Sequence, residues 1–168
     1  MQPSRAAVFN AVFTQISNFI QANYSNYAGV PQFRTLSKSY RPYTKAPSDQ
    51  QPAFFLALGP QKEDQQDAPG KSRLEMCFYA IFFLSLDPLQ QNPSAAEVLL
   101  NALDMVDDAL YNQGRPQSLA AVNGGVPLVY NCWIDRRNGN IELRQPILLQ
   151  QAALIVPITT MSGTRLQP

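Results

Sequence analysis

Carboxylates are the side chains of this sequence that most readily suggest catalysis or metal binding. Asp104, Asp107 and Asp108 lie within about one helical turn of each other, and Asp87 stands at the end of a predicted strand. Metal sites on helices usually add a histidine or a carboxylate from a facing element. The chain has no histidine and so lacks the commonest general base and the commonest metal ligand. We interpret the cluster as a helix surface that faces solvent or a neighbouring subunit.

Nucleophiles and phosphate-binding loops are equally hard to assemble from these residues. Cys77 and Cys132 lie in apolar predicted strands without a histidine to activate them, so we expect buried, unreactive thiols. No G-x-S-x-G motif occurs. Gly124 and Gly125 lack the spacing of a phosphate loop and precede a strand rather than a helix. The sequence predicts no catalysis, no cofactor and no metal.

Length and composition fit one domain, or one domain with an extended arm. The chain has 168 residues, 45% of them hydrophobic and 15% charged, with a net charge of +1. A net charge this close to zero gives no overall electrostatic attraction to nucleic acid or to anionic lipid. Residues 1–21 lack the features of a signal peptide, and the strongest apolar run, 76–86, is too short to span a bilayer. We therefore expect a soluble protein made in a cytoplasm.

Hydrophobic periodicity and capping residues predict two helices. Ser4 can cap a first helix that runs to about Gln21, and its core-facing stripe contains Val8, Val12, Ile16, Phe19 and Ile20. Ser94 and Glu97 form a capping box that opens a second helix, which we expect to end at Gly114. Its apolar stripe contains Leu99, Leu103, Val106 and Leu110, and its polar face contains Glu97, Asn101, Asp104 and Asp108.

Three strands are predicted between these helices. Residues 33–44 alternate loosely and carry basic side chains, as an edge strand or an extended arm would. Residues 52–59 form a short buried strand, and the charged stretch 61–70 is predicted as a flexible loop. Residues 72–86 are apolar on both faces, which indicates a central strand covered by helices or by a neighbouring subunit.

The last third of the chain is predicted to be all strand. One strand runs over 126–135, Asn138-Gly139 gives a two-residue hairpin signal, and 141–145 returns beside it. A final strand covers 148–161, with a bend at Pro157. The fold class is therefore α+β: a mainly antiparallel sheet with two helices packed on one face, in the order α-β-β-β-α-β-β-β.

Charge is distributed unevenly along the chain. Residues 1–60 carry five Lys or Arg and one Asp, 61–112 carry three bases and nine acids, and 113–168 carry five bases and two acids. Complementary patches of this kind could support head-to-tail association, which gives a ring when the rotation closes. The alternative is that these charged residues are distributed over unrelated parts of the surface and form no complementary patches.

Basic residues alternate with aromatics in one extended segment, which suggests a second class of function. The segment contains Arg34, Lys38, Tyr40, Arg41, Tyr43 and Lys45. It could follow a phosphate backbone. The rest of the chain has no matching basic surface and no known nucleic-acid-binding signature, so we rank this interpretation below an assembly role.

The order of elements, together with several stretches of sequence, resembles the tail terminator (tail-completion, lambda-type minor tail) proteins of long-tailed bacteriophages. The resemblance covers residues 4–161 and is carried by RAAVFNAVFTQI, by QPAFFLAL at 51–58, by LEMCFYAIFFLSL, by NPSAAEVLLNALDMVDDAL at 92–110, and by QQAALIVPITTM. It implies a single domain over 1–168, with an extended segment at 22–51 and a flexible loop at 61–71 as departures from the smallest members.

What the resemblance implies is a structural virion protein rather than an enzyme. Such a protein closes into a homohexameric ring on the last ring of the tail tube, stops tube polymerisation and presents a surface for head joining. The implied partners are the chain itself, the major tail tube protein, the head-side connector or stopper protein, and a sheath where the tail has one. DNA would pass through the lumen as cargo, and no membrane is involved. Assembly in the bacterial cytoplasm and residence in the tail or neck of the virion follow.

Interface residues are expected from position and chemistry, because the resemblance supplies no invariant motif. Four cations of the extended segment would contact neighbouring rings: Arg34, Lys38, Arg41 and Lys45. Three acids of the second helix, Glu97, Asp104 and Asp108, would face a basic patch of the adjacent subunit formed by Arg136, Arg137 or Arg144. A head–tail connector or stopper of the same neck is the alternative within structural proteins, and a nucleic-acid-binding module is the alternative outside them.

Overall fold

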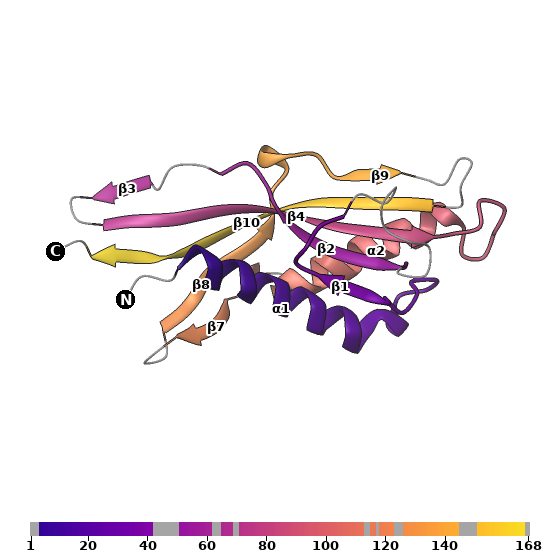
Figure 1. The fold of residues 1–168 in the computed structure, drawn as a ribbon, viewed down its shortest axis with the longest axis horizontal. Helices are drawn as coiled ribbons and strands as arrows, with labels where there is room; N and C mark the ends of the chain where they lie inside the picture. Colours follow the sequence, from indigo (N-terminus) through magenta and orange to yellow (C-terminus); the bar gives the residue numbers. More distant parts are fainter. Residues whose placement is uncertain are drawn as a thin grey trace.

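Two long helices pack on a large twisted sheet in the computed structural model (Figure 1). The structure describes residues 4–41, 51–61, 65–68, 71–112, 115–116, 118–122, 126–144 and 151–166. The elements, in chain order, are α1 Arg5–Asn23, the short 3-10 helix η1 Tyr24–Asn26, β1 Thr35–Ser37, β2 Ala53–Leu58, β3 Gln65–Ala68, β4 Lys71–Ser85, α2 Ala95–Leu110, β5 Tyr111–Asn112, β6 Arg115–Pro116, β7 Leu119–Val122, β8 Val126–Ile134, the 3-10 helix η3 Arg136–Asn138, β9 Glu142–Arg144 and β10 Gln151–Leu166.

The antiparallel pair β4–β10 forms the centre of the sheet, with ladder partners from Gln151–Ser85 to Leu166–Lys71. The strand order is β1-β2-β4-β10-β8-β7, with β3 beside β4 and β9 beside β10, while β5 and β6 form a separate ribbon. Only the β1–β2 pair is parallel among the described pairs. The predicted α+β class and element order are confirmed, with additional short strands.

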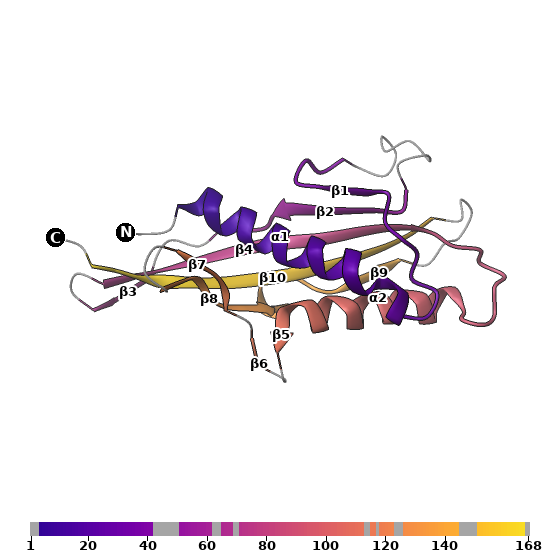
Figure 2. The same cartoon turned by 90° about the horizontal axis from the view of Figure 1, so that it is seen from below.

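The main core lies between the helices and one face of the sheet, and both helices cover that same face (Figures 1 and 2). β4 alternates its side chains, so that Leu74, Met76, Phe78, Ala80, Phe82 and Leu84 all enter this core. Phe54 of β2 stacks on Phe82 at 4.9 Å between ring centroids, and both side chains are fully buried. Burying each such side chain stabilises the fold by about 1.5–3 kcal/mol.

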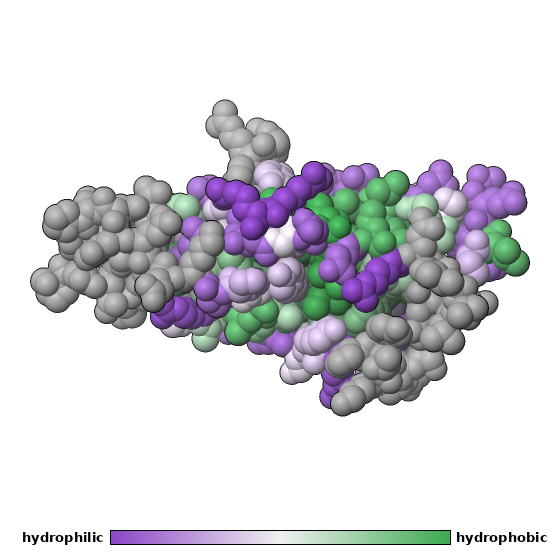
Figure 3. Space-filling view, turned by 90° about the horizontal axis from the view of Figure 1, so that it is seen from above, coloured by the Kyte–Doolittle hydropathy of each residue, from purple (hydrophilic) through white to green (hydrophobic). Residues whose placement is uncertain are grey.

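The opposite face of the sheet is also apolar. Phe55, Ile81 and Phe83 are buried there in a smaller cluster, and Tyr40 packs edge-on against Phe55 at 6.0 Å. Figure 3 looks onto the side of the molecule away from the helices and shows apolar surface between polar flanks. The prediction that residues 72–86 form a central strand, apolar on both faces, is confirmed by β4, in which the side chains of residues 74–84 are buried or half-buried on the two faces.

The N-terminal caps of both helices agree with the sequence prediction, whereas the C-terminal end of α2 differs from it. Ser4 Oγ accepts a hydrogen bond from Ala7 N at 3.1 Å, and Ser94 and Glu97 form the predicted capping box. α2 ends at Leu110, four residues before Gly114, because the chain turns to extended backbone at Tyr111 and enters the β5–β6 ribbon. Gly114 itself lies outside the described residues.

The prediction of a flexible loop over 61–70 is wrong for residues 65–68. These residues form β3, which pairs with β4 through Gln65–Arg73 and Gln66–Ser72. The ladder joins backbone groups, so a polar sequence can extend a sheet when a neighbouring strand offers its edge. Residues 62–64 and 69–70 lie outside the described part of the chain.

The predicted hairpin at Asn138-Gly139 is also wrong. Residues 142–144 do not return beside β8, but instead continue along the same edge of β10, with Glu142 opposite Ile155 and Arg144 opposite Ala153. Gly139 has extended backbone, whereas the expected two-residue turn needs positive φ at its central positions. The 3-10 turn η3 interrupts the edge instead.

Pro157 lies at this interruption, and its carbonyl accepts a hydrogen bond from Asp135 N at 3.0 Å. In an antiparallel strand the N–H and C=O of one residue point to the same side, so the missing N–H of the proline faces the turn rather than a ladder partner. β10 itself runs from 151 to 166, later at both ends than the predicted 148–161.

Candidate functional site

One acidic residue of α2 is bound by another element of the same chain. Asp108 accepts a hydrogen bond from the Tyr27 hydroxyl at 2.5 Å. Burial, followed by this hydrogen bond, raises the pKa of Tyr27. Burial also raises the pKa of Asp107, with the nearby Asp104 and Asp108 carboxylates adding to the effect and Arg136 opposing it. The cluster is therefore a patch of mutually repelling carboxylates beside one arginine.

No metal centre is formed by this patch in the part of the chain that the structure describes. Three or more His, Cys, Asp or Glu side chains do not converge anywhere among those residues. Glu97 has a local role, because its carboxylate accepts a hydrogen bond from Ser94 N at 2.7 Å, and this interaction lowers its pKa. Its position at the first turn of α2 also suits the helix dipole.

Both thiols are buried, as the sequence predicts. Burial raises the pKa of Cys132, so its thiolate form is disfavoured. Cys77 Sγ lies 3.6 Å from Thr159 Oγ1 in the middle of the sheet. Neither sulfur has the exposed, electropositive surroundings of a nucleophilic cysteine.

The described cations of the predicted extended segment flank β1, because Arg34 precedes this strand and Lys38 and Arg41 follow it. Lys38 Nζ donates a hydrogen bond to Asn10 Oδ1 at 2.8 Å and lies 5.8 Å from the centre of the Phe13 ring. Arg34 and Arg41 are exposed. β1 is an edge strand, as predicted, although it is only three residues long. Lys45 lies outside the described residues.

Two of the three arginines expected to form a basic patch have carboxylate partners within the same chain. Arg144 Nη2 lies 2.8 Å from Glu142 Oε2, and Arg137 Nε lies 3.1 Å from Asp135 Oδ1. Arg136 is exposed and lies near the carboxylate of Asp107. The structure thus places the basic turn and the acidic helix close together within one subunit.

Asp135 is the residue that positions this region, and its role was not predicted. Its buried carboxylate accepts hydrogen bonds from Arg137 N at 2.9 Å and from Asn138 Nδ2 at 2.7 Å. Burial by itself would raise the pKa of Asp135, but hydrogen bonds from Arg137 and Thr159 outweigh it and lower the pKa. Asp135 precedes its hydrogen-bonding partners Arg137 and Asn138 by two and three residues, which is the spacing of an Asx turn. This signal in the sequence could have predicted the observed turn in place of a hairpin.

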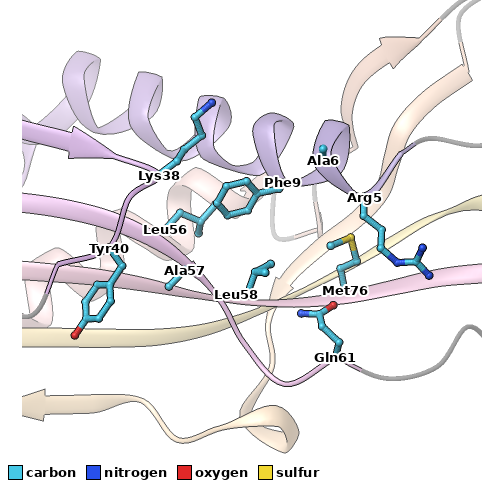
Figure 4. Close-up of a pocket in the computed structure, with 10 residues that line it drawn as sticks. All are labelled: Arg5, Ala6, Phe9, Lys38, Tyr40, Leu56, Ala57, Leu58, Gln61 and Met76. Atoms are coloured by element: carbon cyan, nitrogen blue, oxygen red, sulfur yellow. The ribbon is translucent and has the colours of Figure 1, made fainter.

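A groove of about 520 Å³ lies between α1 and the end of β2, and sequence reasoning did not predict it (Figure 4). Phe9 of α1 points toward Leu56 of β2, and Leu58 and Met76 extend the apolar lining toward Arg5. The complete lining is Arg5, Ala6, Phe9, Lys38, Tyr40, Leu56, Ala57, Leu58, Gln61 and Met76. These side chains offer apolar contact and two cations, without a carboxylate or a nucleophile, which suits the docking of a chain segment better than chemistry on a substrate.

Within the described residues, no helix is long and apolar enough to cross a membrane. No protein-family model matches the sequence, and no curated protein matches it. The fold is similar to that of a chain in the virion of a native gene transfer agent particle, with a TM-score of 0.51 and 14% sequence identity. The match covers 95% of this chain and 99% of that chain. This likeness extends over both folds almost completely.

Proposed function

We propose that this chain is a structural virion protein, the tail terminator of a long-tailed phage-like particle. The observation that carries the proposal is the fold, because it is shared over almost the whole length of a chain from a gene transfer agent virion. The sequence resemblance to tail terminators points to the same class independently. The lack of a metal-ligand cluster among the described residues is compatible with it.

In this proposal the protein forms a homohexameric ring at the head-proximal end of the tail tube. It binds the major tail tube protein on one side, the head-side connector or stopper on the other, and a sheath where one exists. DNA passes through the lumen without being read. Terminating a polymer requires two unlike surfaces: one that binds the last tube ring as a tube subunit would, and one that cannot bind a further tube subunit. In this proposal the helix-covered side and the opposite face of the sheet provide the two surfaces, and the different clusters on these two faces support the assignment.

Charged residues at the surface would supply contacts between subunits and rings. The basic segment with Arg34, Lys38, Arg41 and Lys45 is proposed to contact neighbouring rings, and the acidic face of α2 is proposed to meet cations of the adjacent subunit. These exposed pairs would contribute orientation and association rate more than affinity.

Negative-stain imaging of particles made without this protein tests the proposal. A stop codon is placed in the gene, and the wild-type gene supplied on a plasmid is the control. Overlong or ragged tails detached from full heads are expected for a terminator. Normal-length tails beside unjoined heads would assign the protein to the connector instead. Intact, infectious particles would contradict any role in the neck.

A further inference from the structure

The end of β2 is an open sheet edge among the described residues. β1 pairs with residues 53–55 of β2, and residues 56–58 continue beyond it beside the groove. Gly59 N donates to Cys77 O of β4 at 2.9 Å. Because backbone groups alternate sides along a strand, the N–H and C=O of Leu58 point away from β4. The Leu58 side chain is 62% exposed.

On the opposite side of the same sheet, β9 forms a second edge that pairs with no other described strand than β10. Pro157 O accepts a hydrogen bond from Asp135 N, so alternate residues of β10, including 155 and 153, direct their backbone groups toward β9. Their partners Glu142 and Arg144 therefore bond to β10. The N–H and C=O of Leu143 point outward, and its side chain is 41% exposed.

The two edges match in side-chain direction as well as in backbone direction. Leu143 lies opposite Leu154, a member of the core beneath the helices, so both residues belong to the helix-covered face. Leu58 belongs to that face too, because it alternates with Ala57 and follows Leu56, another member of the core. An antiparallel pair of Leu58 and Leu143 would exchange two backbone hydrogen bonds and bury both leucines in the groove.

Charge complementarity indicates that the occupant of each edge is a second copy of this chain. Residues 4–41 carry four cations and no acid, whereas α2 carries four acids and no base. Three of these cations, Arg34, Lys38 and Arg41, flank or follow β1 at the β2 side of the sheet, whereas α2 packs over β10 and β8 (Figures 1 and 2). Copies placed edge to edge therefore bring the acidic helix of one beside the basic side of the next. Arg137 and Arg144 already have carboxylate partners within their own subunit.

We propose that copies of this chain join head to tail through these edges, with β9 of one copy pairing antiparallel with residues 56–58 of the next. Leu143 of one copy then lies opposite Leu58 of its neighbour, and the sheet continues across the subunit boundary. The contact is heterologous, since the two surfaces differ, and heterologous contacts of suitable rotation close into a ring. The inference rests on the proposed ring and names the surfaces that build it.

Sedimentation velocity of the purified full chain over a range of concentrations tests the pairing. Leu58→Lys and Leu143→Lys each place a cation in the apolar contact and are expected to raise the concentration needed for assembly by at least about tenfold. Leu89→Lys is the matched control, because Leu89 is 84% exposed in the turn before α2, and it is expected to assemble as the wild type does. Circular dichroism melting establishes that each variant is folded.

A rescue variant separates a lost contact from general damage. Leu58→Lys combined with Leu143→Glu places opposite charges at every boundary and is expected to restore assembly. If the wild-type chain forms rings and Leu58→Lys assembles at the same concentration, the edge pairing would be overturned, while the proposed ring itself would stand. A wild-type chain that stays monomeric at every concentration would count against both the edge pairing and the proposed ring. Failure of the double variant to recover, with both single variants folded, would also contradict the pairing.

Discussion

Removing the carboxylate of Asp135 should destabilise the fold more than removing any exposed charge near it. The side chain is 3% exposed, and it holds the η3 turn that carries the chain from β8 to β9. Its two short hydrogen bonds come from Arg137 N and Asn138 Nδ2. At about 1.5 kcal/mol for each bond to a charged acceptor, we expect Asp135→Ala to cost about 3 kcal/mol of unfolding free energy.

Two further variants give the expected order of effects. Asp135→Asn retains one acceptor oxygen and should lose about half as much. Arg137→Ala should change stability little, because the Arg137 side chain is 76% exposed and its ion pair is screened by solvent. Urea unfolding followed by the fluorescence of Trp133, the single tryptophan of the chain, measures all three. It also reports directly on β8, which leads into the turn.

The pH dependence provides a second readout of the same interaction. The folded-state pKa of Asp135 is lowered, so its stabilising contribution is complete above the unfolded pKa of about 3.9 and is lost as the pH falls through the folded pKa. The stability difference between wild type and Asp135→Asn should be constant above about pH 5 and shrink below about pH 4. An Asp135→Ala loss below about 1 kcal/mol, or one equal to that of Arg137→Ala, would refute this reasoning.

Three other outcomes are expected. Phe54→Ala should cost about 3–5 kcal/mol, measured by urea unfolding, because the fully buried ring leaves a cavity in the main core; a cost below about 1 kcal/mol would contradict the packing. Ser94→Ala should lose about 1 kcal/mol through the cap of α2, with Ser39→Ala, in an exposed position outside any helix, as the control. Cys77 and Cys132 should react with a thiol reagent only after denaturant is added, and fast labelling of the native chain would argue against their burial.

The helices and the central strand could be predicted because their signals are local. The capping box of α2 lies within four residues, and the apolar alternation of β4 is complete within one segment. An apolar stripe must be buried whatever covers it. For this reason the core-facing sides of α2 and β4 could be predicted from hydrophobic periodicity alone.

Strand pairing depends on partners that are distant in the sequence, and local turn signals were a poor guide to it. Taken alone, the dipeptide Asn138-Gly139 predicts a hairpin. In the structure the Asp135 carboxylate accepts a hydrogen bond from Asn138 and stabilises a 3-10 turn, and residues 142–144 then pair with β10 instead of β8. The polar sequence of β3 has no strand signal of its own, and it became a strand because β4 extends beyond the helices and offers an unpaired edge.

The sequence alone determined the composition of this protein, its two helices, its two-faced central strand and the lack of histidine-based chemistry, because each of these follows from residue type or from short-range periodicity. The tertiary structure decided which edges of the sheet stay open and which side chains meet across them. Leu58 and Leu143 have no distinguishing signal in the sequence, and their proposed role arises only because the ladder of β2, β4, β10 and β9 directs their backbone groups outward at opposite edges of one sheet.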